Sequence, residues 1–289
     1  MGTSNKYGGP KGSNPLIPSW LGDADGIPSP PAVQPSVPPP VTPLLPGMPK
    51  PPEPKPEPRS APQAQPSHMT GPRKAFNNFV RSGGQSYLRT ALSGYVRRGT
   101  GSSRTAVVRM GPSRQAARTL YQFIQTVNND GLQIALASIS RDDLFGKSAA
   151  DVLGALTDAI CAEGGLIDDA IAREAWDEAV LFTLENGTED IGTMSEEEWE
   201  ALFCDFIARS IEMKVFNDIC TEGVSLPESV AEVNQVENDL HALIGEAVTD
   251  SIGENFSNNE RLDENQIKAV VDDIYSRAFV YLSTLDEEE

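Results

Sequence analysis

Hydrophobic residues recur with the helical period over most of the chain after Pro112. Leu120, Phe123, Ile124 and Val127 follow the i, i+3, i+4, i+7 spacing that places them on one face of a helix. Stripes of the same period recur in residues 152–160, 171–182, 199–207, 233–244 and 267–282. Few stretches alternate polar and apolar residues as half-buried strands do. The pattern predicts an all-α fold for residues 113–289, a helical bundle with these stripes inside.

Polar residues at the helix starts and glycines at the helix ends indicate the expected boundaries. A Ser or Asp side chain before the first turn accepts a hydrogen bond from a free backbone amide, and a Glu or Gln three residues later completes a capping box. Starts are expected at Ser113, Ser148, Ser195 with Glu198, Ser225 with Glu228, and Asp263 with Gln266. Pro227 suits the first turn of the fourth of these helices. Trp176 and Phe182 are expected on an inward face.

Residues 1–72 show neither the hydrophobic period of a helix nor the alternation of a strand. Of the chain's 23 prolines, 21 lie at or before Pro72. Proline fixes φ and lacks an amide donor, so residues 28–72 are expected to be a long disordered tether, similar to polyproline II. Residues 1–27 form a tail before it, with one apolar patch made of Leu16, Ile17, Trp20 and Leu21. Such a patch in a Gly- and Pro-rich segment is typical of a docking element.

Residues 73–112 form a basic region, with two short helices expected at about 73–81 and 85–98 and a break at Gly83-Gly84. Its aromatic residues Phe76, Phe79, Tyr87 and Tyr95 are interleaved with arginines, a pattern found in some nucleic-acid-binding proteins. The alternative, which is favoured, is that the aromatic side chains face the core while the arginines contact the acidic half of the chain or a partner protein. Under either interpretation the contact residues are Arg89, Arg97, Arg98, Arg104 and Arg109.

The formal net charge of −19 hides a strong asymmetry. No Asp or Glu occurs between Arg59 and Val127, whereas 38 acidic residues and 8 basic ones follow from Asp130 onward. The two regions are expected to attract one another or to bind different partners. The chain is thus divided into four predicted parts: a tail (1–27), a tether (28–72), a basic region (73–112) and an acidic all-α domain (113–289).

No catalytic or metal-binding constellation is visible. A nucleophilic Ser or Cys needs a base, usually His, and the chain contains only His68 and His241. Glu237 and His241, one helical turn apart, are interpreted as a surface pair rather than as metal ligands. The three cysteines lack CxxC spacing and are expected to be buried thiols. The chain is therefore not expected to be an enzyme or to carry a metal or any other cofactor.

The sequence also bears on location. It has no apolar run of the length of a membrane span and no signal peptide at its start. A cytoplasmic protein without a membrane partner is expected.

Gly2 is the one residue for which a distinct chemical reactivity is expected. The initiator Met is expected to be removed ahead of this small residue, which leaves an unhindered α-amine. With a pKa near ~8, part of that amine is neutral and nucleophilic at cytoplasmic pH. Thr3 and Ser4 add little bulk, so the end could thread into a narrow pocket. A terminus without any such role remains the alternative.

Several short motifs resemble a known family. Met1-Gly2-Thr3-Ser4, Tyr7-Gly8-Gly9-Pro10 and Pro15-Leu16-Ile17-Pro18-Ser19-Trp20 precede the Pro-rich tether and an Arg-rich segment with Ser102-Ser103-Arg104-Thr105-Ala106. Together they resemble the QatB family of the bacterial Qat anti-phage system. The resemblance implies that the chain acts with an ATPase, a QueC-like enzyme and a TatD-like nuclease. QueC enzymes convert a deazaguanine carboxylate to a nitrile with ATP, so the resemblance further implies that Gly2 accepts a deazaguanine-type conjugation, with Thr3 and Ser4 as recognition positions.

The sequence thus leads to two hypotheses. In the first, the chain is a non-enzymatic component of a bacterial anti-phage complex, whose tail is recognised and modified at Gly2 while its helical body binds other subunits. In the second, the chain is a nucleic-acid-binding subunit that acts through the Arg-rich region, with binding that weakens steeply as salt rises.

Overall fold

The computed structural model describes residues 66–161, 164–221, 224, 227, 229–252 and 261–287. All regular elements in these ranges are helical, which confirms the all-α prediction. The α-helices are α1 (Thr70–Ser82), α2 (Gln85–Gly94), α3 (Ser103–Arg109), α4 (Gly111–Asp130), α5 (Leu132–Ser138), α6 (Ala149–Ile160), α7 (Ile167–Glu185), α8 (Glu196–Cys220), α9 (Val230–Ile252) and α10 (Glu264–Thr284). A π-helix (Tyr95–Gly99) continues α2, and short 3₁₀ turns occupy Pro66–Met69, Asp142–Leu144 and Ile191–Thr193.

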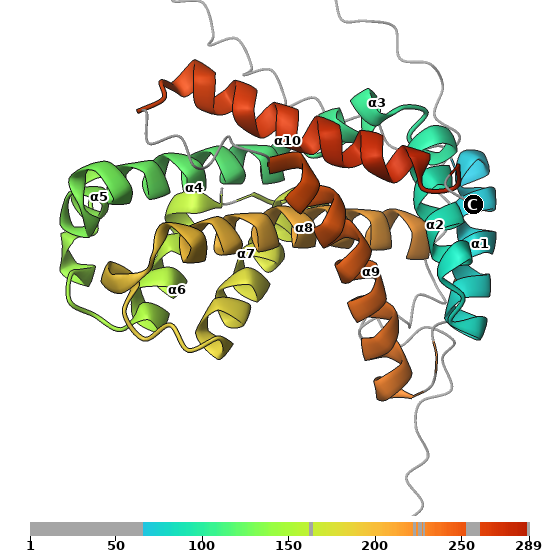
Figure 1. Cartoon of the computed structure of the whole chain (residues 1–289), viewed down its shortest axis with the longest axis horizontal. Helices are drawn as coiled ribbons and strands as arrows, with labels where there is room; N and C mark the ends of the chain where they lie inside the picture. The colour runs from blue at the N-terminus through green and yellow to red at the C-terminus, as the bar shows by residue number, and fades with distance from the viewer. Residues whose placement is uncertain are drawn as a thin grey trace, which may run out of the picture. The chain divides into compact units, whose positions relative to one another are not determined.

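Helix α8 is the centre of this arrangement. It crosses the middle of the described part, with α4 and α10 on one side, α6 and α7 on the other, and α9 leaving it at a steep angle (Figure 1). It contacts α1, α4, α7 and α9. The stripe predicted from the sequence is fully buried on it: Trp199, Leu202, Phe203, Phe206 and Ile207. Trp199 meets Phe123 of α4 edge-on, and Phe206 meets Trp176 of α7 in the same way. The core is therefore built around α8, with α4 packing on one side of this helix and α7 on another.

Three of the predicted helix caps are confirmed. Ser148 accepts a hydrogen bond from the amide of Asp151 at the start of α6. Ser195 with Glu198 and Asp263 with Gln266 form the expected capping boxes of α8 and α10. Each cap satisfies backbone amides that have no partner inside the helix.

Two predicted helix starts were wrong, and a proline is involved in both. Helix α4 begins at Gly111, and Ser113 lies inside it at 2% exposure, because Pro112 has the φ angle of a first turn and needs no amide partner. Helix α9 begins at Val230, and Pro227 lies outside it. Pro227 is therefore not in the first turn of this helix. Ser225 and Glu228, the expected cap, are outside the described residues.

The basic region folds onto the acidic helices. Phe76, Phe79 and Tyr95 are buried, as the favoured interpretation expected, and Phe76 packs edge-on against Phe216 of α8. Tyr87 does not join them and is 43% exposed. Gly83 ends α1 with φ +66°, a left-handed conformation that suits glycine. One continuous hydrophobic core contains residues from both sides of position 112. The four-part division remains a prediction.

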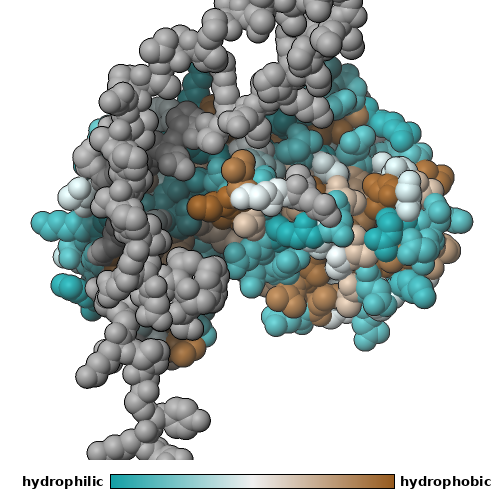
Figure 2. Space-filling view, turned by 180° about the vertical axis from the view of Figure 1, so that it is seen from behind, coloured by the Kyte–Doolittle hydropathy of each residue, from teal (hydrophilic) through white to brown (hydrophobic). Residues whose placement is uncertain are grey.

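Apolar side chains on the surface are dispersed. On the face opposite to that of Figure 1, they form separate patches among hydrophilic side chains (Figure 2). Phe182, expected on the inward face of α7, is 42% exposed. It lies at the edge of the buried face of α7, which continues past it to Val180 and Thr183. No described helix has the length and hydropathy needed to cross a membrane.

Candidate functional site

The predicted tail site is not part of the described ranges. The modification residue Gly2 and the recognition residues Thr3, Ser4, Leu16, Ile17, Trp20 and Leu21 all lie outside them. Their roles remain predictions.

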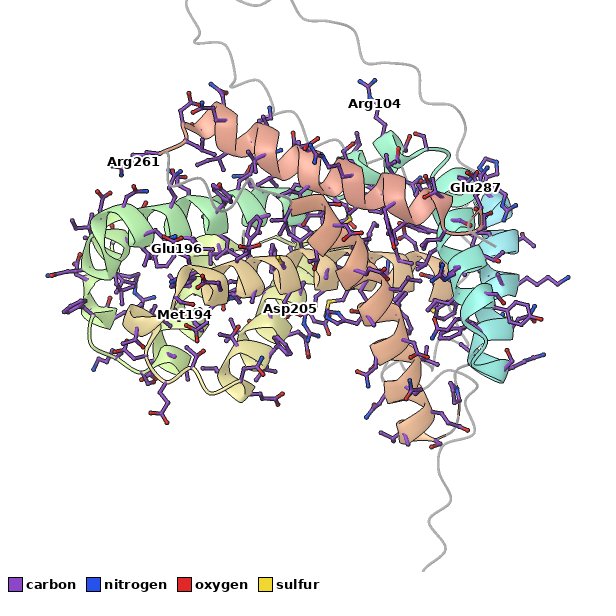
Figure 3. The ribbon with its side chains drawn as sticks, viewed as in Figure 1. Arg104, Met194, Glu196, Asp205, Arg261 and Glu287 are labelled. Atoms are coloured by element: carbon purple, nitrogen blue, oxygen red, sulfur yellow. The ribbon has the colours of Figure 1, made fainter. Side chains whose placement is uncertain are left out.

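The five predicted contact arginines have different environments. Arg97 pairs with Asp286 and Glu287 just beyond α10, at 3.0 Å in each case. Arg98 and Arg104 are exposed, and Arg104 points away from the body (Figure 3). Arg89 is half-buried on α2, and Arg109 is only 6% exposed at the end of α3. The structure therefore does not bring these arginines together into one basic surface, and it places Arg109 out of reach of a nucleic acid.

Two further arginines contact the acidic half directly. Arg114 Nε donates to Asp272 Oδ1 at 2.9 Å, and Arg118 Nη2 donates to the same oxygen at 2.5 Å. Asp272 lies on α10 and both arginines on α4. With Arg97, these pairs agree with the interpretation that arginines of the basic stretch contact acids of the same chain.

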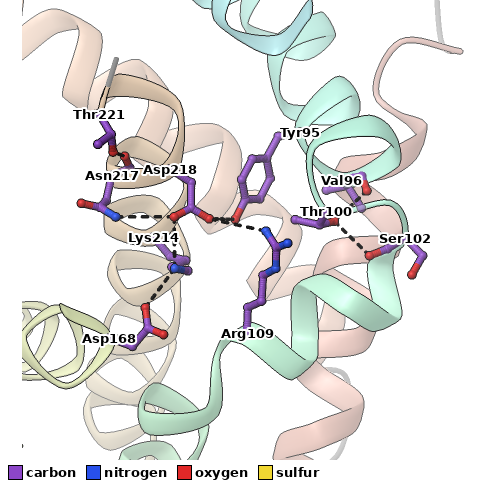
Figure 4. A network of polar contacts seen from close by, with 10 residues as sticks. All are labelled: Tyr95, Val96, Thr100, Ser102, Arg109, Asp168, Lys214, Asn217, Asp218 and Thr221. Carbon is purple, nitrogen blue, oxygen red and sulfur yellow. Dashed lines mark hydrogen bonds and ion pairs between the residues drawn. The ribbon is translucent and has the colours of Figure 1, made fainter. Parts of the chain in front are cut away.

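Arg109 belongs to a buried polar network that joins four elements (Figure 4). Tyr95 Oη donates to Asp218 Oδ2 at 3.0 Å, and Arg109 Nη1 lies 3.9 Å from the same oxygen. Lys214 Nζ donates to Asp168 Oδ1 at 2.9 Å and to Asp218 Oδ1 at 3.1 Å. Burial, and then the charge of Asp218, raises the pKa of Tyr95 well above its usual value, so the phenol stays protonated. The charges of two carboxylates and two cations balance in this network. Its role is therefore to hold the four elements together.

A second polar cluster surrounds His241 on α9. Its Nδ1 lies 2.8 Å from Glu212 Oε2 and its Nε2 lies 3.1 Å from Asp205 Oδ1, both on α8. Hydrogen bonds to Asp205 and Glu212 raise the pKa of His241 to about 9, so the ring is a cation at neutral pH. Arg209 Nε also donates to Asp205, at 2.7 Å.

The predicted pair of Glu237 with His241 is thus corrected. The imidazole uses both nitrogens on α8, because α9 crosses α8 at this point, and neighbours across a helix contact can outweigh a neighbour one turn away. Glu237 remains near the cluster, and its pKa is raised by burial and by the charges of Glu212 and Glu178.

His241 lines two cavities. One, of about 470 Å³, lies along the N-terminal half of α8 and includes Phe182, Glu200 and Cys204. The other, of about 860 Å³, lies along the C-terminal half and includes Glu178, Met213 and Phe216. Both lie between α7, α8 and α9. The sequence analysis missed these cavities, because three helices line them and no single stretch of the sequence indicates them.

The described side chains offer little chemistry for catalysis. They contain no group of three or more His, Cys, Asp or Glu that could hold a metal ion. Burial raises the pKa of Cys161, Cys204 and Cys220 to about 12, so these thiols are protonated and poorly nucleophilic at neutral pH. The described surface instead carries charged side chains and two cavities, and both are features that suit binding.

Comparison with known proteins identifies a family. A family model described as the Qat anti-phage system associated protein QatB matches residues 101–282, which include every helix from α3 to α9 and nearly all of α10. No curated protein and no solved structure matches the chain. Because the family match covers more than half of the sequence, the chain belongs to the QatB family, whose description places it in an anti-phage system.

Proposed function

We propose that the chain is a non-enzymatic, cytoplasmic component of an anti-phage complex, whose helical body binds other subunits and whose tail is modified at Gly2. The observation that carries this proposal is the family match, which falls on the helical body. The ion pairs and protonated thiols of that body support a binding role rather than catalysis. The partners are a QueC-like enzyme, an ATPase and a TatD-like nuclease, as the resemblance implies.

The proposed chemistry at Gly2 is acyl transfer performed by the QueC-like partner. That enzyme activates a deazaguanine carboxylate with ATP. The neutral Gly2 amine attacks the activated carbonyl carbon, a C–N bond forms, and the bond to the activating group breaks as the amine loses a proton. Thr3 and Ser4 present the amine, while the patch of Leu16, Ile17, Trp20 and Leu21 provides a second point of attachment. The product is an amide at the N-terminus.

The mass of the N-terminal peptide tests this proposal. The chain is purified alone and after co-expression with the subunits encoded beside it, and we expect an added mass on Gly2 only in the second case. Inserting one Ser between Met1 and Gly2 moves the reactive glycine inward and should abolish both the added mass and protection against phage. The same Ser added after Glu289 is the control and should change neither. Full protection by the insertion variant would contradict the proposed role of Gly2.

The nucleic-acid alternative is less well supported. Of the five predicted contacts, Arg109 is buried and Arg97 is paired with acids of the same chain, while Arg98 and Arg104 are exposed. Contacts between so few cations and phosphates predict weak binding with only a shallow salt dependence, because the slope grows with the number of phosphates neutralised.

A further inference from the structure

The smaller of the two cavities lined by His241 is a pocket with its own chemistry. We call it the α8–α9 pocket. It has a volume of about 470 Å³ and is lined by the N-terminal half of α8, by α9 and by Phe182 of α7. Asp205, which pairs with His241 where α8 and α9 cross, also lines it (Figure 3). The larger cavity, along the C-terminal half of α8, is not part of it. A volume of this size is in the range of about 300 to 1,000 Å³ that binding pockets have.

Gly245 keeps this pocket open on the α9 side. It lies in the interior of α9, where glycine weakens a helix relative to almost any other residue. The fold gives no reason for this glycine, because its φ is not positive and a Cβ built on it would have no non-neighbouring atom within 4 Å. A larger side chain at this position would therefore extend into the pocket without a clash at its Cβ.

The lining of the pocket is partly apolar. Phe182 presents an exposed aromatic ring, and Ala201 and Cys204 present a methyl group and a thiol. Burial, together with the charges of Glu200 and Asp205, raises the pKa of Cys204 to about 12, so this thiol is neutral. An occupant with an apolar portion would be in contact with these groups.

The charged part of the lining is acidic. Glu197, Glu200 and Asp205 are the carboxylates, and His241 is the cation. His241 is already engaged, since it pairs with Asp205 and with Glu212. Glu200 is half-buried and has no ion pair with any described residue. The pocket therefore offers one unpaired carboxylate to a cation from outside.

We propose that the α8–α9 pocket binds the side chain of an arginine from another subunit of the defence complex. The guanidinium group pairs with Glu200 and lies against the ring of Phe182, while the methylene stem passes beside Cys204 and Gly245. Arginine fits better than lysine, because its planar group both stacks on an aromatic ring and donates two hydrogen bonds to one carboxylate. Arginines seated in pockets are also frequent hot spots of protein interfaces.

This inference rests on the proposed function, in which the helical body binds other subunits. It specifies where one contact is made and which side chain of the partner makes it.

Filling the pocket tests its shape. Gly245→Leu in the full chain places a side chain in the pocket, and Gly154→Leu is the matched control. Gly154 is an exposed glycine inside α6, it also has open space around a built Cβ, and it lines neither cavity. Because leucine favours a helix over glycine, both substitutions should raise the midpoint of thermal unfolding, by about 2 to 4 °C.

Only the first substitution should affect binding. Each purified variant is titrated against the subunits encoded beside it. We expect Gly245→Leu to bind at least ~10-fold more weakly than the wild type and Gly154→Leu to bind within ~2-fold of it. A large fall in the unfolding midpoint of Gly245→Leu would show that the fold already uses this space, and would overturn the inference.

The charge of the pocket is tested by Glu200→Gln. This change keeps the shape of the side chain and removes its charge, so we expect weaker binding at low salt and a smaller difference from the wild type at high salt. Glu246→Gln is the control, because Glu246 is exposed on α9 next to Gly245 and lines neither cavity. Equal binding by the two variants at low salt would contradict the proposed ion pair.

A double-mutant cycle identifies the occupant. Exposed arginines of the neighbouring subunits are replaced by Ala one at a time. We expect one replacement to weaken binding to the wild-type chain by ~10-fold or more, and to weaken binding to Gly245→Leu by no more than ~2-fold, because that contact is already lost. If the effect of every replacement simply adds to that of Gly245→Leu, no arginine occupies the pocket.

The outcomes separate this inference from the proposed function. If the wild-type complex forms and Gly245→Leu binds as well as Gly154→Leu, the pocket is not a contact site, although the body still binds subunits. If the wild-type chain binds no subunit at all, both proposals fail. Native mass spectrometry of the chain purified alone covers the remaining case: a small organic cation that the wild type retains and Gly245→Leu loses would overturn the inference, because the occupant would then not be a partner subunit.

Discussion

His241 shows how strongly its neighbours set the charge of one side chain. An isolated histidine is mostly neutral at pH 7.5, but Asp205 and Glu212 stabilise the protonated ring and raise its pKa to about 9. The buried carboxylate of Asp205 depends on this arrangement as well, since it has only His241 and Arg209 as charged partners among the described residues. The cation therefore stabilises the crossing of α8 and α9, and it does so in a pH-dependent way.

The sign of that dependence follows from the two pKa values. The pKa of His241 is about 9 in the fold and 6.5 as a reference, so its contribution is complete below about pH 6.5 and is lost as pH rises through about 9. We expect the free energy of unfolding of the wild type to fall by about 2 kcal/mol over that range, after a discount for the partial exposure of the ring. In His241→Gln this fall should be absent. Chemical denaturation at several pH values measures the free energy of unfolding of both proteins. His68 is present in both, so any effect of its titration cancels in the comparison. Equal pH profiles for the two proteins would show that His241 is not charged in the fold.

Three helix boundaries were predictable from the side chain that makes the cap. Ser148, Ser195 and Asp263 do so, and their helices begin where the sequence indicated. Helix α3 is only 7 residues long, too short for a clear period, and was not predicted. The inward face of α7 was predicted less well at Phe182, because the buried positions there are Val180 and Thr183 instead. Period identifies the buried face of a helix, but which residues at the edge of that face are covered depends on the neighbouring helices.

The cap of α8 matters more than most because α8 contacts so many other helices. Replacing Ser195 by Ala removes the acceptor for the Glu198 amide and half of the capping box. We expect a loss of about 1 kcal/mol and a midpoint of thermal unfolding lower by about 2 to 4 °C. Ser138→Ala is the matched control, since its hydroxyl donates only to the carbonyl of Ala135 in its own helix. A shift of the same size in both variants would mean that the cap is not the cause.

The attraction between the basic and the acidic stretches was readable from charge alone, but its contacts were not. Net charge says that the regions attract and does not say which carboxylate meets which arginine. In the structure a single residue, Asp272 on α10, accepts from both Arg114 and Arg118. The two cavities lined by His241 were unpredictable for a similar reason: residues of α7, α8 and α9 form them together, and no single stretch of the sequence shows them.

Asp272 offers a test of this long-range attraction. Asp272→Ala leaves two arginines one turn apart on α4 without their shared acceptor, and we expect a loss of about 1 to 2 kcal/mol of stability. The difference from the wild type should shrink in 1 M salt, where charges are screened within about 3 Å. Asp273→Ala is the control, because its partner Arg277 is exposed and on the same helix, and such pairs contribute little. If both variants unfold alike at low salt, the shared acceptor does not stabilise the fold.

The long separation of the paired segments has a consequence for synthesis. Arg73 Nε donates to the carbonyl of Ile219, 146 residues later, and Arg97 pairs with Asp286, 189 residues later. At about 5 to 20 residues per second, the ribosome needs roughly 10 to 40 s to make the chain between Arg97 and its partner. During that time the basic helices have emerged while their acidic partners have not. Up to Val127 the chain carries 15 Lys and Arg against 4 Asp and Glu, so the early nascent chain is a polycation, and ribosomal RNA is the nearest polyanion.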